Sequence, residues 1–390
     1  MSTKEIIRAN WNYPTAIKVG AGRIKELPDL CISLGMKNAL LITDPGLAQL
    51  PIVQQAVANC QSDGLGCAVF SQIKGNPTEK NVTDGVHAYR AGKHDGVIAF
   101  GGGSALDAAK AVALMVGQNR PLWDFEDIGD NYLRVNVVGM APVVAVPTTA
   151  GTGSEVGRAS VITDNQAHIK RIIFHPKMLP TIVILDPELT VGLPPKMTAA
   201  TGMDALSHCL EAYCSSYYHP MASGIALEGI RLIKEWLPRA VQDGSNLEAR
   251  LHMLVTSTMG ATAFQRGLGA MHALAHPLGA LYDAHHGTLN AILMPYVLQA
   301  NRNAIDERIT RLARYLDLSQ PSFSAFLDWI LALRETIGIP NSLAEIGIDD
   351  AQAALIGRMA VVDGSAATNP IQFSERDYAD ILRNAVAGRL

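Results

Sequence analysis

Short apolar runs that alternate with helical patterns dominate the first half of the chain and restrict its fold more than any other feature. These runs lie at residues 17–19, 38–43, 66–70, 96–100, 143–146 and 181–185, and segments with helical patterns lie between them. Strands that are apolar throughout are typical of a parallel sheet covered by helices on both faces. The sequence therefore predicts an α/β domain built on a mostly parallel sheet.

The second half of the chain has a different pattern. After Pro194 and Pro195 the strand-like runs end, and helical patterns follow at 222–240, 247–264, 305–316, 323–337, 349–361 and 376–387. Hydrophobic residues make up 48% of the chain, enough for a large core. We therefore expect an α/β nucleotide-binding domain at residues 1–193 and an all-helical domain at residues 194–390.

Charge and cysteine content exclude several classes of partner. The net charge of −4 argues against binding to nucleic acid or to an anionic membrane surface. No apolar run has the length needed to span a bilayer, and the charged, polar first residues do not resemble a signal peptide. The five cysteines lack zinc-finger spacing and read as reduced thiols. These features predict a cytoplasmic protein.

Two glycine-rich loops follow strand-like runs and are candidate phosphate sites. Gly101-Gly102-Gly103-Ser104 lies between the run at 96–100 and a helical pattern, and residues 147–155 read PTTAGTGSE. Glycines let the backbone approach an anion, and a helix start offers free N–H groups. The GGGS loop alone is weak evidence, because a plain tight turn is at least as good an explanation. Asp44 follows the run at 38–43 and is a candidate for the ribose diol of a nucleotide, with a turn cap as an equal alternative.

Histidines gather in one apolar segment of the second half. Residues 267–295 hold His272, His276, His285 and His286 among Ala, Leu, Gly and Met, and a buried imidazole needs a partner. Upstream, Asp204 and His208 are spaced i,i+4 and share one face of a predicted helix. Together with two of the later histidines they would provide one oxygen and three nitrogen ligands, a set that suits Fe(II) or Zn(II). The spacing alone leaves open which two histidines bind, and a surface pair or a polar turn remains the alternative.

Five motifs in this order resemble the iron-containing (group III) alcohol dehydrogenase family over nearly the whole chain. They are GGGSALDAAK, PTTAGTGSEV, DPELTVGLP, MTAATGMDALSHCLEAY and GLGAMHALAHPLGALYDAHHG. The resemblance implies a dehydroquinate synthase-like architecture and reversible, NAD-dependent hydride transfer between a small primary alcohol and its aldehyde. It also implies Fe(II) as the metal, with Zn(II) as the alternative, and a homodimer or larger homo-oligomer.

The resemblance further implies roles for individual residues. The metal ligands are Asp204, His208, His272 and His286, and His276 is the catalytic histidine that handles the proton. The residues that contact NAD are Asp44, Asn76, Gly102, Gly103, Ser104, Thr148, Thr149, Thr152, Lys170 and Leu189. The run from Ala263 to His272 departs from the family's usual form, so substrate contacts there are not carried over.

Several alternatives remain open at this level. A zinc-dependent polyol dehydrogenase, a lyase resembling dehydroquinate synthase, and a catalytically silent nucleotide-binding subunit share the predicted fold. Arg158, Arg266 and His285 also lie close in sequence to the predicted site. Because arginine grips carboxylates with paired hydrogen bonds, an anionic hydroxy acid or semialdehyde such as 4-hydroxybutyrate is the alternative substrate class.

Overall fold

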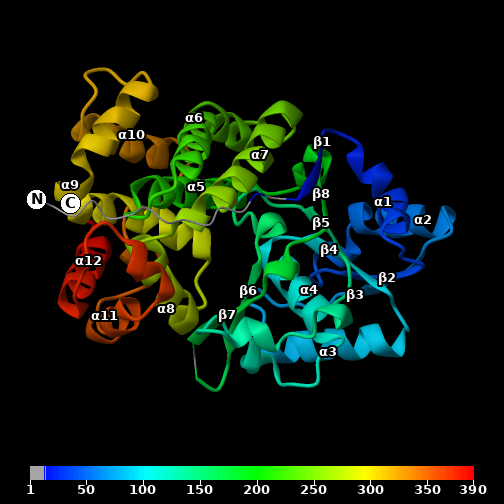
Figure 1. Cartoon of the computed structure of the whole chain (residues 1–390). Coiled ribbons are helices and arrows are strands. Elements are labelled where there is room, and N and C mark those ends of the chain that lie inside the picture. Colours follow the sequence, from blue (N-terminus) through cyan, green and yellow to red (C-terminus); the bar gives the residue numbers. More distant parts are fainter. Residues whose placement is uncertain (1–12, 14, 168) are drawn as a thin grey trace, which may run out of the picture. The chain divides into compact units, whose positions relative to one another are not determined.

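A computed structural model describes residue 13, residues 15–167 and residues 169–390 of the chain (Figure 1). It divides into two compact units. One contains the described residues of Pro14–Thr201 together with Arg239–Thr258, and the other contains Gly202–Pro238 and Met259–Leu390. Residues 1–12, for which a signal peptide is not expected, lie outside the described residues. No helix in the described part of the chain is both long and apolar enough to cross a membrane.

A six-stranded sheet forms the centre of the first unit. Its strands are β1 (Ala16–Val19), β2 (Asn38–Ile42), β3 (Gly66–Phe70), β4 (Gly96–Gly101), β5 (Val143–Pro147) and β8 (Ile182–Leu185). They lie in the order β1-β8-β5-β4-β2-β3, and every neighbouring pair is parallel. β4, β5 and β8 are buried at every residue, which explains why these runs are apolar throughout. The predicted parallel α/β sheet is confirmed.

Helices provide the packing surfaces for both faces of this sheet. They are α1 (Leu27–Ser33), α2 (Pro51–Ser62), α3 (Glu79–Ala91) and α4 (Gly103–Met115). Leu27 of α1 and Val53 of α2 share one core cluster with Leu41, Ile98 and Val144 of the strands. Because side chains alternate along a strand, the residues between these point to the opposite face. α4 packs against β4 and β5, and α3 packs against α4.

A two-stranded antiparallel hairpin in the same unit has no counterpart in the sequence prediction. It joins β6 (Ala159–Asp164) to β7 (Ile169–Phe174). Buried and partly buried residues alternate along β6, and β7 is mostly half-buried. The segment therefore lacks the continuous apolar run that marked the central strands. The hairpin carries Lys170 and packs against α4.

The second unit is helical, as expected. Its elements include parts of α5 (Pro195–Cys214), α6 (Pro220–Gln242) and α7 (Leu247–Ala263), and all of α8 (Ala270–Tyr282), α9 (His286–Tyr315), α10 (Phe323–Thr336), α11 (Ala353–Val361) and α12 (Glu375–Ala387). The expected domain boundary near residue 193 precedes α5 by two residues. The compact units instead divide within α5, between Thr201 and Gly202, and Arg239–Thr258 belongs to the unit that contains the sheet.

Candidate metal centre and cofactor loops

Three helices of the second unit carry the predicted metal ligands. Asp204 and His208 lie one turn apart on α5, His272 lies in the first turn of α8, and His286 is the first residue of α9. Asp204, His208 and His272 are 2%, 5% and 1% exposed. The turn that leads into α8 needs glycine at Gly267, where φ is +115° and a Cβ atom would lie 2.4 Å from the side chain of Thr368.

The four side chains converge. Ligand atoms of Asp204, His208 and His272 all lie within 4.8 Å of one another. His208 Nε2 is 4.0 Å and His286 Nε2 is 3.7 Å from Asp204 Oδ1. The rings of His208 and His272 are stacked, with centroids 4.8 Å apart. Tetrahedral ligands at about 2.1 Å from an ion lie roughly 3.4 Å from each other, so these ligand atoms would have to move closer together to hold one.

Asn290, on α9, provides a test of whether these residues suit a cation. Its amide nitrogen lies 2.9 Å from Asp204 Oδ1, 3.2 Å from His272 Nε2 and 3.1 Å from His286 Nε2. Two N–H groups thus face three candidate ligand atoms, while the buried amide oxygen has no hydrogen-bond partner among the described residues. A carboxylate and several imidazole nitrogens directed at one point favour a divalent metal ion. The donor set therefore fits the expected metal.

A buried carboxylate that sequence reasoning missed orients one of the ligands. Glu211, on α5, accepts a hydrogen bond from His272 Nδ1 at 2.7 Å through Oε2. Burial lowers the pKa of His272, but the hydrogen bond and the negative charge of Glu211, with smaller contributions from Asp204 and Asp363, outweigh it and raise the pKa. With Nδ1 donating to Glu211, Nε2 is the atom left to face Asp204 and Asn290.

His276 lies one turn after His272 and has its own carboxylate partner. Its Nδ1 atom is 2.8 Å from Asp363 Oδ2, and its ring stacks on that of His286 with centroids 5.5 Å apart. Burial raises the pKa of Asp363, but the charge of His276 and its hydrogen bond outweigh burial and lower it. The structure therefore separates two histidines that sequence spacing could not separate: His272 is grouped with Asp204 and His208, whereas His276 is held by Asp363.

The three residues considered for anion binding have different surroundings in the structure. Arg266 is buried and donates to the carbonyl oxygens of Tyr217 and Ser215 and to the hydroxyl of Ser223. Arg158 is half-buried, with its guanidinium 5.6 Å from the centre of the Phe174 ring. His285 caps α9 by accepting from the Thr288 N–H. The predicted anion-binding role is not supported for Arg266, because three of its N–H groups donate to Tyr217, Ser215 and Ser223 and so hold the chain before α6 to the first turn of α6.

In the first unit, the two glycine-rich loops lie against each other. Gly102 is the N-cap of α4, and Thr148 N donates to Gly101 O at 3.0 Å. A Cβ atom on Gly103 would lie 2.5 Å from the Thr152 side chain, so glycine is needed for the loops to approach. Gly102, Gly103, Ser104, Thr149 and Thr152 are all partly exposed. This leaves the start of α4 accessible to a phosphate group.

Two charged side chains of α4 hold the second loop and β6 in place. Lys110, 1% exposed, donates to Ser154 O at 2.9 Å and to Ala159 O, and lies 3.2 Å from Asp107 Oδ1. Asp107 accepts from the Ser154 hydroxyl and, at 2.9 Å, from Val161 N. α4, the second loop and β6 are thus joined by one network.

The remaining predicted cofactor residues occupy three other places in this unit. Asp44 follows β2, and its Oδ1 accepts from Gly46 N and Leu47 N at 2.9 Å each, so the expected turn cap is present. Lys170 on β7 donates to Asn76 Oδ1 at 2.8 Å. Leu189 is buried in the core cluster on the α1 and α2 face of the sheet. Oδ2 of Asp44 takes no part in these two hydrogen bonds.

Glu211, Asn290, Asp363 and Lys110 are the residues that sequence reasoning missed. Glu211 had a usable signal, because it follows Asp204 and His208 at i+7 and i+3 on the same helix face. Asp363 had none, because 87 residues separate it from His276.

Comparisons with known proteins agree with this arrangement. Residues 14–187 match the family model described as iron-containing alcohol dehydrogenase, and residues 198–386 match that of the C-terminal part of the Fe-containing alcohol dehydrogenase family. The chain is 38% identical to 4-hydroxybutyrate dehydrogenase of Cupriavidus necator over 96% of this chain and 99% of that one. It is 35% identical to NAD-dependent methanol dehydrogenase of Bacillus methanolicus over 97% and 100%.

Solved structures give the same result. A 1,3-propanediol oxidoreductase superposes with a TM-score of 0.92 at 35% identity, covering 97% of this chain and 100% of that one. Sulfoacetaldehyde reductase from Bifidobacterium kashiwanohense, solved in complex with NAD+, superposes with a TM-score of 0.89 at 28% identity, covering 98% and 99%.

Proposed function

The chain belongs to the iron-containing alcohol dehydrogenase family, and on that premise we propose that it interconverts small primary alcohols and their aldehydes with NAD, using Fe(II) held by Asp204, His208, His272 and His286. The observation that carries this proposal is the convergence of these four side chains around the amide of Asn290. A silent subunit has no need for such a buried donor set. Zn(II) is the alternative metal, because the same ligands suit both ions.

The relatives support the substrate class through a shared chemical group. Methanol, 1,3-propanediol and 4-hydroxybutyrate, the substrates in the relatives' names, all carry an unbranched primary alcohol. Only one of the three has an anionic end, and Arg266 already donates three hydrogen bonds to Tyr217, Ser223 and Ser215. A neutral short-chain alcohol is therefore the proposed substrate.

The side chains of this protein contribute positioning and proton handling. When bound, the metal polarises the substrate oxygen and NAD carries the hydride. His276 is the proposed relay for the hydroxyl proton. Because its Nδ1–H donates to Asp363, Nε2 is free to accept a proton, and the imidazolium that forms is stabilised by the Asp363 carboxylate. The paired loops at Gly101–Ser104 and Thr148–Ser154 hold the cofactor phosphates through the start of α4.

Aldehyde-dependent NADH oxidation by metal-stripped and metal-reconstituted enzyme tests the proposal. We expect butanal reduction to be lost on chelation and restored by Fe(II), and succinic semialdehyde to be no better a substrate than butanal. His272→Ala should lose bound metal, whereas His276→Ala should retain metal and lose rate. Full metal occupancy in His272→Ala would contradict the ligand assignment.

Two finer statements belong to the proposal. Five buried, free cysteines support a reducing compartment such as the cytoplasm. The proposal that the chain forms a homodimer or larger homo-oligomer rests on the family resemblance. Sedimentation of the purified chain measures the mass of the assembly and tests it.

A further inference from the structure

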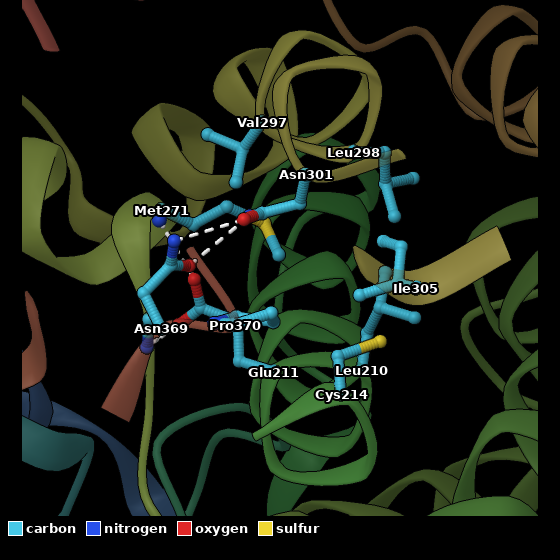
Figure 2. A pocket seen from close by; sticks show the side chains of 11 residues that line it. Leu210, Glu211, Cys214, Met271, Val297, Leu298, Asn301, Ile305, Asn369 and Pro370 are labelled. Atoms are coloured by element: carbon cyan, nitrogen blue, oxygen red, sulfur yellow. Dashed lines mark hydrogen bonds between the residues drawn. The ribbon is translucent and has the colours of Figure 1, made fainter. Parts of the chain in front are cut away.

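Glu211 is a buried carboxylate that is only 6% exposed and has no ion pair with lysine or arginine among the described residues. Its oxygens accept three hydrogen bonds: Oε1 from Met271 N at 2.7 Å, and Oε2 from Gly269 N at 2.8 Å and His272 Nδ1 at 2.7 Å. Figure 2 shows its side chain on α5, next to Met271, Asn301 and Asn369. A buried carboxylate without a cation is costly unless its oxygens accept hydrogen bonds. The three hydrogen bonds to Glu211 therefore account for its burial, and they fix its position.

The surroundings of Glu211 keep it in one position. It borders a cavity of about 20 Å³ lined mainly by apolar side chains such as Leu210, Val297 and Ile305. That volume admits roughly a single water molecule, so few waters can contact the carboxylate. Asn369 receives the adjacent Ala270 N–H and pairs with Asn301 through two hydrogen bonds. The first turn of α8 is therefore bound to side chains of α5 and of the segment before α12.

The contact with His272 has a chemical consequence beyond holding the helix. A carboxylate accepts, so Nδ1 of His272 carries the hydrogen, and Nε2 presents its lone pair toward the Asn290 amide, in the group that His272 forms with Asp204 and His208. A hydrogen-bonded carboxylate also makes an imidazole a stronger metal ligand, and losing such a partner typically weakens metal binding about 10–100-fold.

We propose that Glu211 is a positioning residue that presents His272 to the metal through Nε2 and thereby sets the affinity of the site. This rests on the proposed function, because it requires His272 to be a metal ligand. Glu211 does not touch substrate or cofactor in this role; it acts through His272.

The test is the dissociation constant for Zn(II) of metal-stripped enzyme, measured by competition with a chromogenic chelator. Glu211→Gln, which preserves shape and removes the charge, should bind Zn(II) about 10–100-fold more weakly than wild type. Glu345→Gln is the matched control, because it makes the same change in a carboxylate that accepts from Asn341 N and Ser342 N and forms no hydrogen bond or ion pair with a proposed ligand among the described residues; its dissociation constant should stay within about threefold of wild type. The absorption spectrum of the Co(II)-substituted Glu211→Gln enzyme should also differ from that of wild type.

A purely structural role gives a different result. Weaker hydrogen bonds from Gly269 N and Met271 N would then lower the melting temperature of the metal-stripped variant, while the dissociation constant and the Co(II) spectrum stayed as in wild type. That result would overturn the proposal. If Glu211→Gln does not fold, Glu211→Asp decides: it keeps the charge but is too short to hold His272, and wild-type affinity in it overturns the proposal. Failure of wild type itself to bind metal would overturn the proposed function, and the inference with it.

Discussion

Lys110 is the side chain whose loss should most weaken the unit that contains the sheet. In Lys110→Met the buried stem is kept, but Ser154 O and Ala159 O lose their donor and Asp107 loses its cation. Removing one partner of a buried ion pair costs about 3–5 kcal/mol. Asp107 retains the Ser154 hydroxyl and Val161 N as donors, so we expect the lower end, about 3 kcal/mol.

Calorimetry measures this effect directly. For a unit of this size, about 3 kcal/mol corresponds to a fall in melting temperature of roughly 6–12 °C. Because Ser154 belongs to the second cofactor loop, NADH affinity, measured by fluorescence titration, should fall as well. The matched control is Lys80→Met on α3, where the lysine side chain is 79% exposed and its pair with Asp84 is worth about 0–1 kcal/mol. If both variants melt within about 2 °C of each other, the network does not stabilise the loops as described.

Two further predictions concern the same unit. Asp44→Asn keeps an acceptor for Gly46 N and Leu47 N, so it should retain the melting temperature of wild type. It removes the negative charge, so it should raise kcat/KM for NADP relative to kcat/KM for NAD. A wild-type enzyme that already prefers NADP would disprove this role for Asp44. Burial raises the pKa of Glu155 above its usual 4.5, so its stabilising contribution is complete below pH 4.5 and is lost as the pH rises above that value. Glu155→Gln, which still accepts from the Thr258 hydroxyl, should therefore melt higher than wild type at pH 8 and gain less at pH 4.5, and a gain that does not grow with pH would contradict this assignment.

The fold class could be predicted because it rests on local patterns. Fully apolar strands such as β4 and β5 and the helical spacing after Pro195 are readable from neighbouring residues. The β6–β7 hairpin was missed for the same reason: its half-buried strands mix polar and apolar residues, and its stability comes from pairing and from packing on α4.

The sequence by itself determined the kinds of ligand and their helix faces: an i,i+4 spacing places Asp204 and His208 together on any helix. It also placed the glycine loops after strands. Which of His272 and His276 faces Asp204 was decided by the tertiary structure, in which the His272 ring donates to Glu211 on α5 and the His276 ring donates to Asp363. The sequence likewise placed Arg266 near the predicted site, but only the tertiary structure shows that it donates to the carbonyl oxygens of Ser215 and Tyr217. Hydrogen bonds between residues tens of positions apart depend on the packing of whole helices, and no local pattern carries that information.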